Sequence, residues 1–409
     1  MQNQFPKNWR KVKLGEVVDI NPRQINKDNF HKEIEYVDIS AVGTATLEST
    51  TTHLLSEAPG RARRLVKNGD TIISTVRPNR RSFYYFKNPT DNLVVSTGFA
   101  VLSSKLKITD SRFIYYLVTQ KSFTHYLTSN VKGSAYPAIT TDVIENAEVL
   151  IPAYEEQNQI ASILSSFDDK IEVNIKIAKT LEETAQVIFK EWFKKFKFPG
   201  HEKVKMIDSE LGKIPEGWEI KKLSDLVSTQ YGYTESASEK EIGPRFLRVM
   251  DINKSDWIDW SSVPYCKIND KDLLKYRLSA GDVVIARMAD PGKVAIIEEN
   301  VNAVFASYLI RLKPLNKSVG NYFLYFYLTS SQYQGFIFGS STGTTRQSAN
   351  ARVITDCYLA VPKDEIIKEF ETIANLLRKM IQTKVKENQK LAEMRDLLLP
   401  KLMRGELRV

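Results

Sequence analysis

The sequence predicts an α+β fold made of two similar globular blocks, each followed by a long helix. Three observations lead to this prediction. Apolar residues with a heptad period run through one stretch near the middle of the chain and through another at its end. Short β-rich segments and one helical piece precede the first stretch. Landmarks of this whole unit return about 210 residues later, so we expect one structural repeat in each half of the chain.

The first long helix is predicted over residues 155–193. Its apolar positions are spaced alternately four and three apart, which is typical of a coiled-coil seam. These positions are Ile160, Leu164, Phe167, Ile171, Ala178, Leu181, Ala185, Ile188 and Trp192, with Asn174 on the remaining rung. Pro152 lies just ahead of the helix, and Glu155 and Glu156 lie in its first turn, where the helix dipole favours carboxylates.

A second helix is predicted over residues 365–402. Its apolar positions are Phe370, Ile373, Leu377, Ile381, Leu391, Leu398 and Leu402. Lys384 and Asn388 are polar rungs of this seam, as Asn174 is of the first. Polar residues inside a seam cost stability but restrict the register of the two helices. The alternative is that these three residues face solvent at an imperfect seam.

The spacing of matched residues defines the repeat. Pro152 and Pro362 lie 210 residues apart, and Trp9 and Trp218 lie 209 apart. The predicted division is a first block over 1–152, a helix over 153–196, a linker over 197–213, a second block over 214–362 and a helix over 363–409. Each block has the β-rich, α+β composition of a small domain.

Composition indicates a globular chain without a membrane segment. Of its 409 residues, 42% are hydrophobic and 26% are charged, which is enough for two or more cores. No apolar run approaches ~18 residues and the N-terminus has no signal-peptide profile, so a cytoplasmic location is expected. Cys266 and Cys357 are isolated from each other and from the histidines. We therefore predict neither a metal site nor a disulfide.

The net charge of +9 is unevenly distributed. Between residues 61 and 87, eight basic residues face one acid, Asp70, and four aromatic residues at 83–86 are interleaved with them. The basic residues are Arg61, Arg63, Arg64, Lys67, Arg77, Arg80, Arg81 and Lys87. Basic groups beside aromatic rings suit a polyanion. A solvated basic face is the alternative.

Two kinds of loop are candidate DNA-binding sites. In the first block a predicted strand ends in a loop that carries Arg77, Asn79, Arg80 and Arg81. Guanidinium groups bind phosphates and base edges bidentately, although Arg77 has the alternative of a structural role. In the second block Arg287 follows the matching strand.

The second kind of loop contains glycine and hydroxyl groups, and it recurs at matching positions. Its candidate residues are Lys132, Ser134 and Tyr136 in the first block and Thr344, Thr345, Arg346 and Gln347 in the second. Glycine lets a backbone approach a ligand closely, and the flanking side chains donate hydrogen bonds suited to phosphates or bases.

Motifs for catalysis are missing from the sequence. An adenine methyltransferase that uses S-adenosylmethionine would carry a glycine-rich cofactor loop and an Asn-Pro-Pro-aromatic motif. Asn21-Pro22-Arg23 and Asn88-Pro89-Thr90 lack both the second proline and the aromatic residue. No phosphate-binding Walker loop, zinc motif or nuclease-like cluster stands out. We therefore predict a binding subunit with no catalytic residues and no cofactor of its own.

Taken together, the repeated motifs resemble the specificity subunit of type I restriction-modification systems. The resemblance covers essentially the whole chain. It is carried by Ile214-Pro215-Glu216-Gly217-Trp218, Gly69-Asp70 with Gly281-Asp282, Gly133-Ser134-Ala135-Tyr136-Pro137, Ile151-Pro152, Glu156-Gln157-Asn158-Gln159-Ile160-Ala161, Asp168-Asp169-Lys170-Ile171 and the segment from Leu399 to Leu407. In the second copy, 369–374 is aligned so that Phe370 replaces Gln157.

The resemblance implies two target-recognition domains, carried by the two blocks, and an antiparallel coiled coil formed by the two long helices. It implies double-stranded DNA as the ligand, read as a bipartite asymmetric site with a fixed spacer. Methyltransferase subunits, two of them expected, would carry S-adenosylmethionine, and endonuclease subunits would join through the complex.

Two alternatives remain open at this point. The chain could be the DNA-reading subunit of a methylation-only or nuclease-free defence system. It could also be a coiled-coil scaffold that holds two protein partners without DNA specificity. Heparin retention and salt-sensitive DNA binding would be absent from a pure scaffold.

Overall fold

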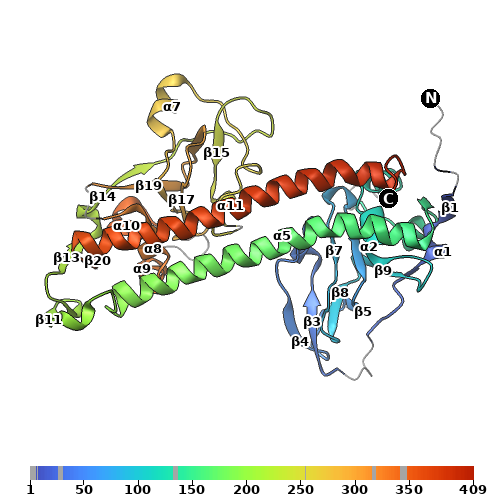
Figure 1. Cartoon of the computed structure of the whole chain (residues 1–409), viewed down its shortest axis with the longest axis horizontal. Coiled ribbons are helices and arrows are strands. Elements are labelled where there is room, and N and C mark those ends of the chain that lie inside the picture. Colours follow the sequence, from blue (N-terminus) through green and yellow to red (C-terminus); the bar gives the residue numbers. More distant parts are fainter. Residues whose placement is uncertain are drawn as a thin grey trace. The chain divides into compact units, whose positions relative to one another are not determined.

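The computed structural model describes residues 6, 8–25, 31–131, 137–253, 255–315, 319–340 and 348–409. The chain forms two compact units: unit 1 is residues 1–171 with 389–409, and unit 2 is residues 172–388. Each unit contains one globular block and a segment of both long helices (Figure 1). Within the described ranges, none of the helices is both long and apolar enough to cross a membrane.

The block of unit 1 is built on two four-stranded sheets. The central sheet has the order β2 (Val18–Ile20), β9 (Phe99–Ser104), β6 (Thr71–Ser74) and β7 (Phe83–Tyr85), all antiparallel. The other has the order β4 (Thr51–Leu54), β3 (Glu33–Val37), β8 (Leu93–Ser96) and β5 (Ala62–Leu65), with β3 and β8 parallel. β1 (Arg10–Lys13) pairs with β10 (Glu148–Ile151). Helical segments are α1 (Leu14–Val17), η1 (Ile39–Ala41), η2 (Pro78–Arg80), α2 (Ser111–Val118), α3 (Lys121–Ser129) and α4 (Thr141–Glu145).

The block of unit 2 repeats this plan. Its central sheet has the order β14 (Val227–Tyr231), β19 (Leu309–Pro314), β16 (Val283–Ala286) and β17 (Val294–Ile296). β15 (Arg245–Leu247) and β18 (Ala303–Phe305) form the parallel pair, and β13 (Glu219–Lys222) pairs with β20 (Tyr358–Val361). Helical segments are η5 (Leu223–Asp225), α6 (Val249–Ile252), α7 (Asp270–Tyr276), α8 (Asn321–Thr329), α9 (Ser331–Ser340) and α10 (Ala351–Thr355).

A buried aspartate closes the same turn in both blocks. Asp70 accepts a hydrogen bond from the Lys67 amide at 2.7 Å, and Asp282 accepts one from the Ser279 amide at 3.0 Å. Each carboxylate is also ion-paired with an arginine of its own block, Arg23 for Asp70 and Arg311 for Asp282. The two arginines, Arg23 and Arg311, are not at equivalent positions of the repeat. The two blocks therefore share the aspartate turn but pair it with different arginines.

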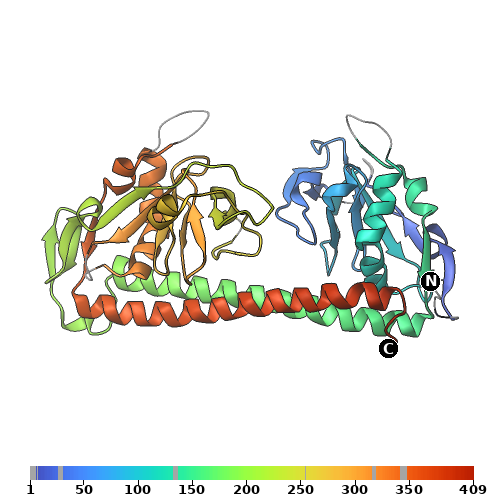
Figure 2. The same cartoon turned by 90° about the horizontal axis from the view of Figure 1, so that it is seen from above.

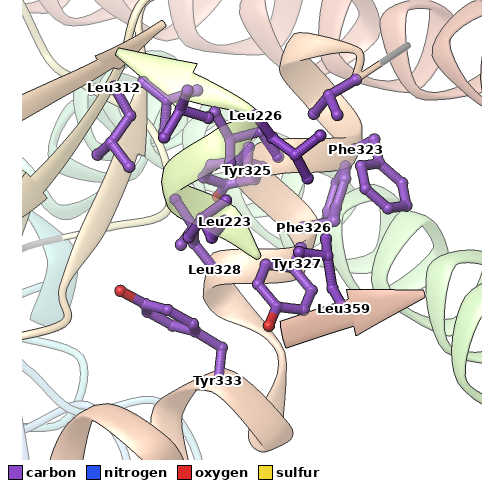
Figure 3. Packing of buried hydrophobic residues seen from close by; sticks show 14 of the residues in the cluster. Leu223, Leu226, Leu312, Phe323, Tyr325, Phe326, Tyr327, Leu328, Tyr333 and Leu359 are labelled. Atoms are coloured by element: carbon purple, nitrogen blue, oxygen red, sulfur yellow. The ribbon is translucent and has the colours of Figure 1, made fainter. Parts of the chain in front are cut away.

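Aromatic and aliphatic side chains fill the core of unit 2. Figure 3 shows rings from α8 and α9 packed against leucines of η5 and the sheets. The labelled residues are Leu223, Leu226, Leu312, Phe323, Tyr325, Phe326, Tyr327, Leu328, Tyr333 and Leu359. The core of unit 1 includes Leu402 and Met403, so the end of the second long helix is part of the first block's hydrophobic cluster.

The long helices are α5 (Tyr154–Phe189), continued by the π-helical turn η3 (Lys190–Lys194), and α11 (Asp364–Met403). Within unit 2, Asn174 contacts Asn388 and Glu182 contacts Arg378, so residue numbers fall along α11 as they rise along α5. Figure 2 shows the two helices side by side. The predicted α+β fold, with two repeated blocks and an antiparallel coiled coil, is confirmed.

The residues of the predicted seam are not all fully buried. Leu181, Ile188 and Trp192 are only partly buried, whereas Glu182 and Phe189 one position further are buried. On α11, Arg378 is 1% exposed although it is charged. An apolar pattern counts only hydrophobic residues, so it passed over the two charged residues that neutralise each other inside the interface.

The polar rungs follow two different geometries. Asn174 is 0% exposed, and its amide donates to the Asn388 side-chain oxygen at 2.8 Å, so this pair lies in the seam as predicted. Lys384 is partly exposed and pairs with Glu387 on its own helix at 2.9 Å. Of the three predicted polar rungs, the two asparagines therefore join the helices directly and can restrict their register.

The spacing of 210 continues into the helices and corrects one alignment. α5 begins at Tyr154 and α11 at Asp364, which sets Phe370 opposite Ile160, not Gln157, in the repeat. Both Ile160 and Phe370 are 0% exposed, as equivalent core positions should be. The sequence alignment was three residues out because it matched Ile160-Ala161 to Ile373-Ala374, which lie 213 residues apart.

The segment predicted as a linker has regular structure. η4 (His201–Lys203) is followed by a hairpin of β11 (Met206–Ser209) and β12 (Gly212–Pro215). Phe198 is buried, with its ring centroid 5.5 Å from that of Trp218. The many lysines of this segment suggested a solvated loop, but one aromatic anchor fixes its start against the core.

We expect Gln157→Leu to destabilise unit 1. The Gln157 side chain is 0% exposed, donates to the carbonyls of Ile108 and Pro152, both at 3.1 Å, and accepts from the Asp110 amide at 3.0 Å. Leucine would leave these backbone groups unpaired, at a cost of about 2 kcal/mol or more in the free energy of unfolding. Urea unfolding measures the loss. The exposed Gln159→Leu is the control, and equal losses for both variants would contradict the assignment.

Candidate nucleic-acid interface

In the first block, the end of β6 is held by the chain segment that follows the glycine-containing loop. Val76 forms a β-bridge with Ala138, and the Arg77 amide donates to the Pro137 carbonyl at 2.8 Å. The Ile139 amide donates to the Thr75 carbonyl at 2.9 Å. The segment that begins at Pro137 therefore runs beside the residues that follow β6, next to the first candidate loop.

The second block has the same anchoring. Met288 forms a β-bridge with Ser348, and the Ala349 amide donates to the Arg287 carbonyl at 2.9 Å. Met288 and Arg287 lie 212 residues after Val76 and Thr75. Ser348 and Ala349 lie 210 residues after Ala138 and Ile139. The structure thus places equivalent loop anchors in both blocks. The predicted residues Lys132, Ser134, Tyr136, Thr344, Thr345, Arg346 and Gln347 lie outside the described residues.

The four candidates of the first block differ in their surroundings. Arg77 has a left-handed backbone (φ 47°) and is partly buried, whereas Asn79 and Arg80 are exposed in η2. Arg81 donates to the Thr119 carbonyl at 2.8 Å, and its guanidinium lies 5.6 Å from the centroid of the Phe83 ring. Arg81 is therefore fastened to the end of α2, while Arg80 projects into solvent.

The aromatic residues within the basic stretch do not form a binding face. Phe83 and Phe86 are buried, in the core clusters on the two faces of β7. The two phenylalanines lie three residues apart, so in extended chain they point to opposite sides. Both phenylalanine rings therefore belong to the core, although the Phe83 ring also contacts Arg81.

Arg287 of the second block is held at several points. Its amide donates to the Tyr308 carbonyl at 2.9 Å, and its guanidinium reaches the Ser307 carbonyl at 3.5 Å. The guanidinium lies 5.1 Å from the centroid of the Tyr231 ring, a cation–π distance. The Tyr231 hydroxyl in turn accepts a hydrogen bond from the Ala351 amide at 3.0 Å.

Sequence reasoning missed Tyr231 and Tyr308. They are 43% and 49% exposed beside Arg287, and together with it they form the Arg287 cluster. Tyrosine is common in β-strands, so its presence at a strand end did not indicate a contact with an arginine. One signal was available: Tyr231 precedes Gly232, where a Cβ atom would come within 2.2 Å of the Ala306 carbonyl oxygen. This close packing requires glycine at position 232, and it therefore fixes the end of β14, where Tyr231 lies.

The two blocks carry different side chains at equivalent places in this frame. Arg287 corresponds to Thr75, whose hydroxyl donates to the Gly98 carbonyl at 2.8 Å. Tyr231 corresponds to Pro22, at the spacing of 209 that relates β2 to β14. The arginine and the ring beneath it therefore occur together in one block and are both replaced in the other.

In the described residues, no group of three or more histidine, cysteine, aspartate or glutamate side chains could hold a metal ion. Both cysteines are buried, and burial raises the pKa of Cys266 to about 11. Such a thiol stays protonated at neutral pH, because the thiolate is the form that burial disfavours.

Comparison with known proteins gives a match in both halves of the chain. The family described as the type I restriction modification DNA specificity domain matches residues 6–183 and again residues 215–394. The specificity subunit of the type I restriction enzyme HindI from Haemophilus influenzae is 25% identical, over 98% of this chain and 99% of that one. The MjaIX specificity subunit from Methanocaldococcus jannaschii is 30% identical, over 83% of this chain and 78% of that one.

A solved structure shares the fold. The S subunit of a type I restriction-modification system from M. genitalium aligns over 98% of this chain and 97% of its own, with a TM-score of 0.56 at 14% identity. The two family matches fall on the two copies of the repeat and together span most of the sequence. The chain therefore belongs to the family of type I restriction-modification specificity subunits.

Proposed function

We propose that this chain is the DNA-reading subunit of a type I restriction-modification complex. Each block would read one half of a bipartite, asymmetric site, and the antiparallel helices would hold the spacer constant. The observation that carries the proposal is the repeated loop anchor with unlike residues at matched places, Thr75 in one block and Arg287 in the other. A common frame with different side chains suits two readers of different half-sites.

The Arg287 cluster is suited to recognition of a guanine or a phosphate. A guanidinium held against a ring loses little conformational entropy on binding. Its planar group of N–H donors can form two parallel hydrogen bonds with a phosphate or a guanine. Arg80 and Asn79 are exposed donors of the first block. Arg346 and Gln347 of the recurring loop remain proposals from the sequence.

Methyl transfer and cleavage would belong to partner subunits. We expect two methyltransferase subunits, which would bring S-adenosylmethionine, and endonuclease subunits joined through them. Exposed apolar side chains on α11, including Leu376, Met380 and Leu397, are 46–67% exposed and offer surface for such partners. A methylation-only or nuclease-free system would need the same reader, and the genes beside this one would distinguish the two.

Removing Arg287 should relax one position of the recognised sequence. If the side chain reads a guanine, Arg287→Ala should cost ~1–3 kcal/mol of discrimination at a single base pair. If it contacts a phosphate, affinity should fall equally for all sequences, with a salt slope smaller by about one. Tyr231→Leu should reproduce the effect more weakly, and Tyr231→Phe should largely preserve preference because it retains the ring. Binding to a library of single-base variants measures this.

The control for this series is Lys213→Ala on the β11–β12 hairpin, which removes the same charge elsewhere. It should leave every base preference unchanged. Unaltered binding and base preference in Arg287→Ala and in Arg80→Ala would remove both residues from the interface.

Exchange of one block should change one half-site. Replacing residues 1–152 by the matching block of a relative should alter one half of the recognised sequence and keep the other half and the spacer length. Each block has its own core, so its loops are built independently of the other block. Mapping of methylated sites in a host with the methyltransferase partner measures the outcome. A chimera that changed both halves would exclude two independent readers.

The isolated chain should transfer no methyl group to DNA. We expect incorporation of labelled methyl from S-adenosylmethionine only after a methyltransferase subunit is added, since the sequence lacks the cofactor loop and catalytic motif. Incorporation by the purified chain alone would contradict a purely DNA-reading role.

A further inference from the structure

In both units an acid on α5 is ion-paired with a base on α11, so relative to the repeat the two contacts are reversed. In unit 1, Asp168 on α5 is ion-paired with Arg395 on α11. In unit 2, Arg378 on α11 is ion-paired with Glu182 on α5. We call the helix that follows each block in the sequence the block's own helix: α5 for the first block and α11 for the second. The first block therefore has an acid, Asp168, on its own helix, and the second has a base, Arg378.

Asp168 and Arg378 occupy the same place in the repeat. They lie 210 residues apart, the spacing that relates α5 to α11. Asp168 accepts a hydrogen bond from the Tyr116 hydroxyl on α2, and the Arg378 guanidinium lies 5.2 Å from the centroid of the Tyr325 ring on α8. α2 and α8 are equivalent helices, so the same site carries opposite charges in the two copies.

The facing helix is reversed in the same way. Arg395 corresponds to position 185 of the first copy, and Glu182 lies one helical turn before that position. The partner helix therefore presents a base to the first block and an acid to the second. Both exchanges are needed for each contact to remain an ion pair.

We propose that each half of this chain is built to pair with the other half and to reject a second copy of itself. Two first halves would set Asp168 against Glu182, and two second halves would set Arg378 against Arg395. Glu182 and Arg378 have side chains only 1% exposed, so solvent would screen such like charges poorly. Like charges at an interface select against the wrong partner.

The asparagine pair gives independent support. Asn388 corresponds to Ala178 of the first copy, by the same spacing of 210. In a pair of first halves, Asn174 would face alanine in place of Asn388 and would lose the hydrogen bond that it donates. Because Asn174 is 0% exposed, its amide would be left without that partner in the interior.

Charges contributed by the blocks do not remove the conflict. Lys87 and Arg112 pair with Asp169, and Glu298 pairs with Arg378. These groups come with their own half and keep their partners whichever helix arrives. The facing pairs, Asp168 with Glu182 or Arg378 with Arg395, would still be of like sign.

The test begins with the full-length protein. A protease site is inserted between Glu210 and Leu211, the exposed turn of the β11–β12 hairpin, and the folded chain is cut there. Two preparations with different isotope labels are mixed at the urea midpoint of unfolding, diluted and examined by native mass spectrometry. We expect mixed-label pairs of a first and a second half, with like pairs at least about tenfold below their statistical share. Statistical amounts of all three pairings would overturn the proposal.

A single substitution should redirect the pairing. Glu182→Arg would face Asp168 in a pair of first halves and Arg378 in the native pair, so first-half pairs should now form. Glu183→Arg makes the same charge change at an exposed position next to it and should leave the distribution as in the parent chain. A redistribution of equal size in both variants would overturn the proposal.

If the cut halves do not reassemble, thermal unfolding of the uncut chain decides. Glu182→Arg should lower Tm more than Glu183→Arg, and adding Arg378→Glu to Glu182→Arg should recover part of the loss. Equal losses for the two single variants, or no recovery in the double variant, would overturn the proposal.

Discussion

The constraint on which the rest of this structure depends is the register of the two long helices. An apolar seam alone permits slippage, because neighbouring rungs are similar in size and chemistry. Here Arg378 joins α5 to α11 through Glu182 and to the second block through Glu298, all within unit 2. A shift by one turn would leave these charges buried and unpaired, at a cost of about 3–5 kcal/mol for a broken pair. The polar contacts therefore select one register from several that hydrophobic burial would allow.

Burial raises the pKa of two carboxylates that lie between α11 and the second block, Glu298 and Glu371. Glu298 has its pKa raised chiefly by desolvation, although Arg378 and Gln382 act in the opposite direction. Glu371 has its pKa raised by burial too, although it accepts from the Phe323 amide at 2.7 Å. That bond caps α8, whose N-cap residue is Gly320; in the first block the side chain of Asp110 caps α2. A helix of the second block thus obtains from α11 the cap that its counterpart carries itself.

The sequence was sufficient for the architecture because repetition and heptad period are properties of whole segments. Matched prolines before the two helices and matched Gly-Asp turns fixed the boundaries of the repeat without any three-dimensional information. Glu182 and Arg378 could not be predicted, since a charged residue on an apolar face is read as solvent-exposed until its partner is known. The π-helical turn at Lys190–Lys194 was included in the helix but not distinguished from it. Tyr231 and Tyr308 were missed because contact with Arg287 depends on strand pairing between distant segments.

In the candidate site, the contacts that maintain the fold and the side chains that could contact a ligand belong to different groups of atoms. Backbone bonds make the loop anchor: the Ile139 amide to Thr75 and the Ala349 amide to Arg287 use no side-chain atoms. The side chains at those positions can therefore change without disturbing the anchor, and in this chain they differ between the two copies. The buried turn carboxylates Asp70 and Asp282 are the reverse case, because their side-chain oxygens hold the backbone directly. Residues that hold the frame are thus kept in both blocks, while residues that project from it are free to give each block a different preference.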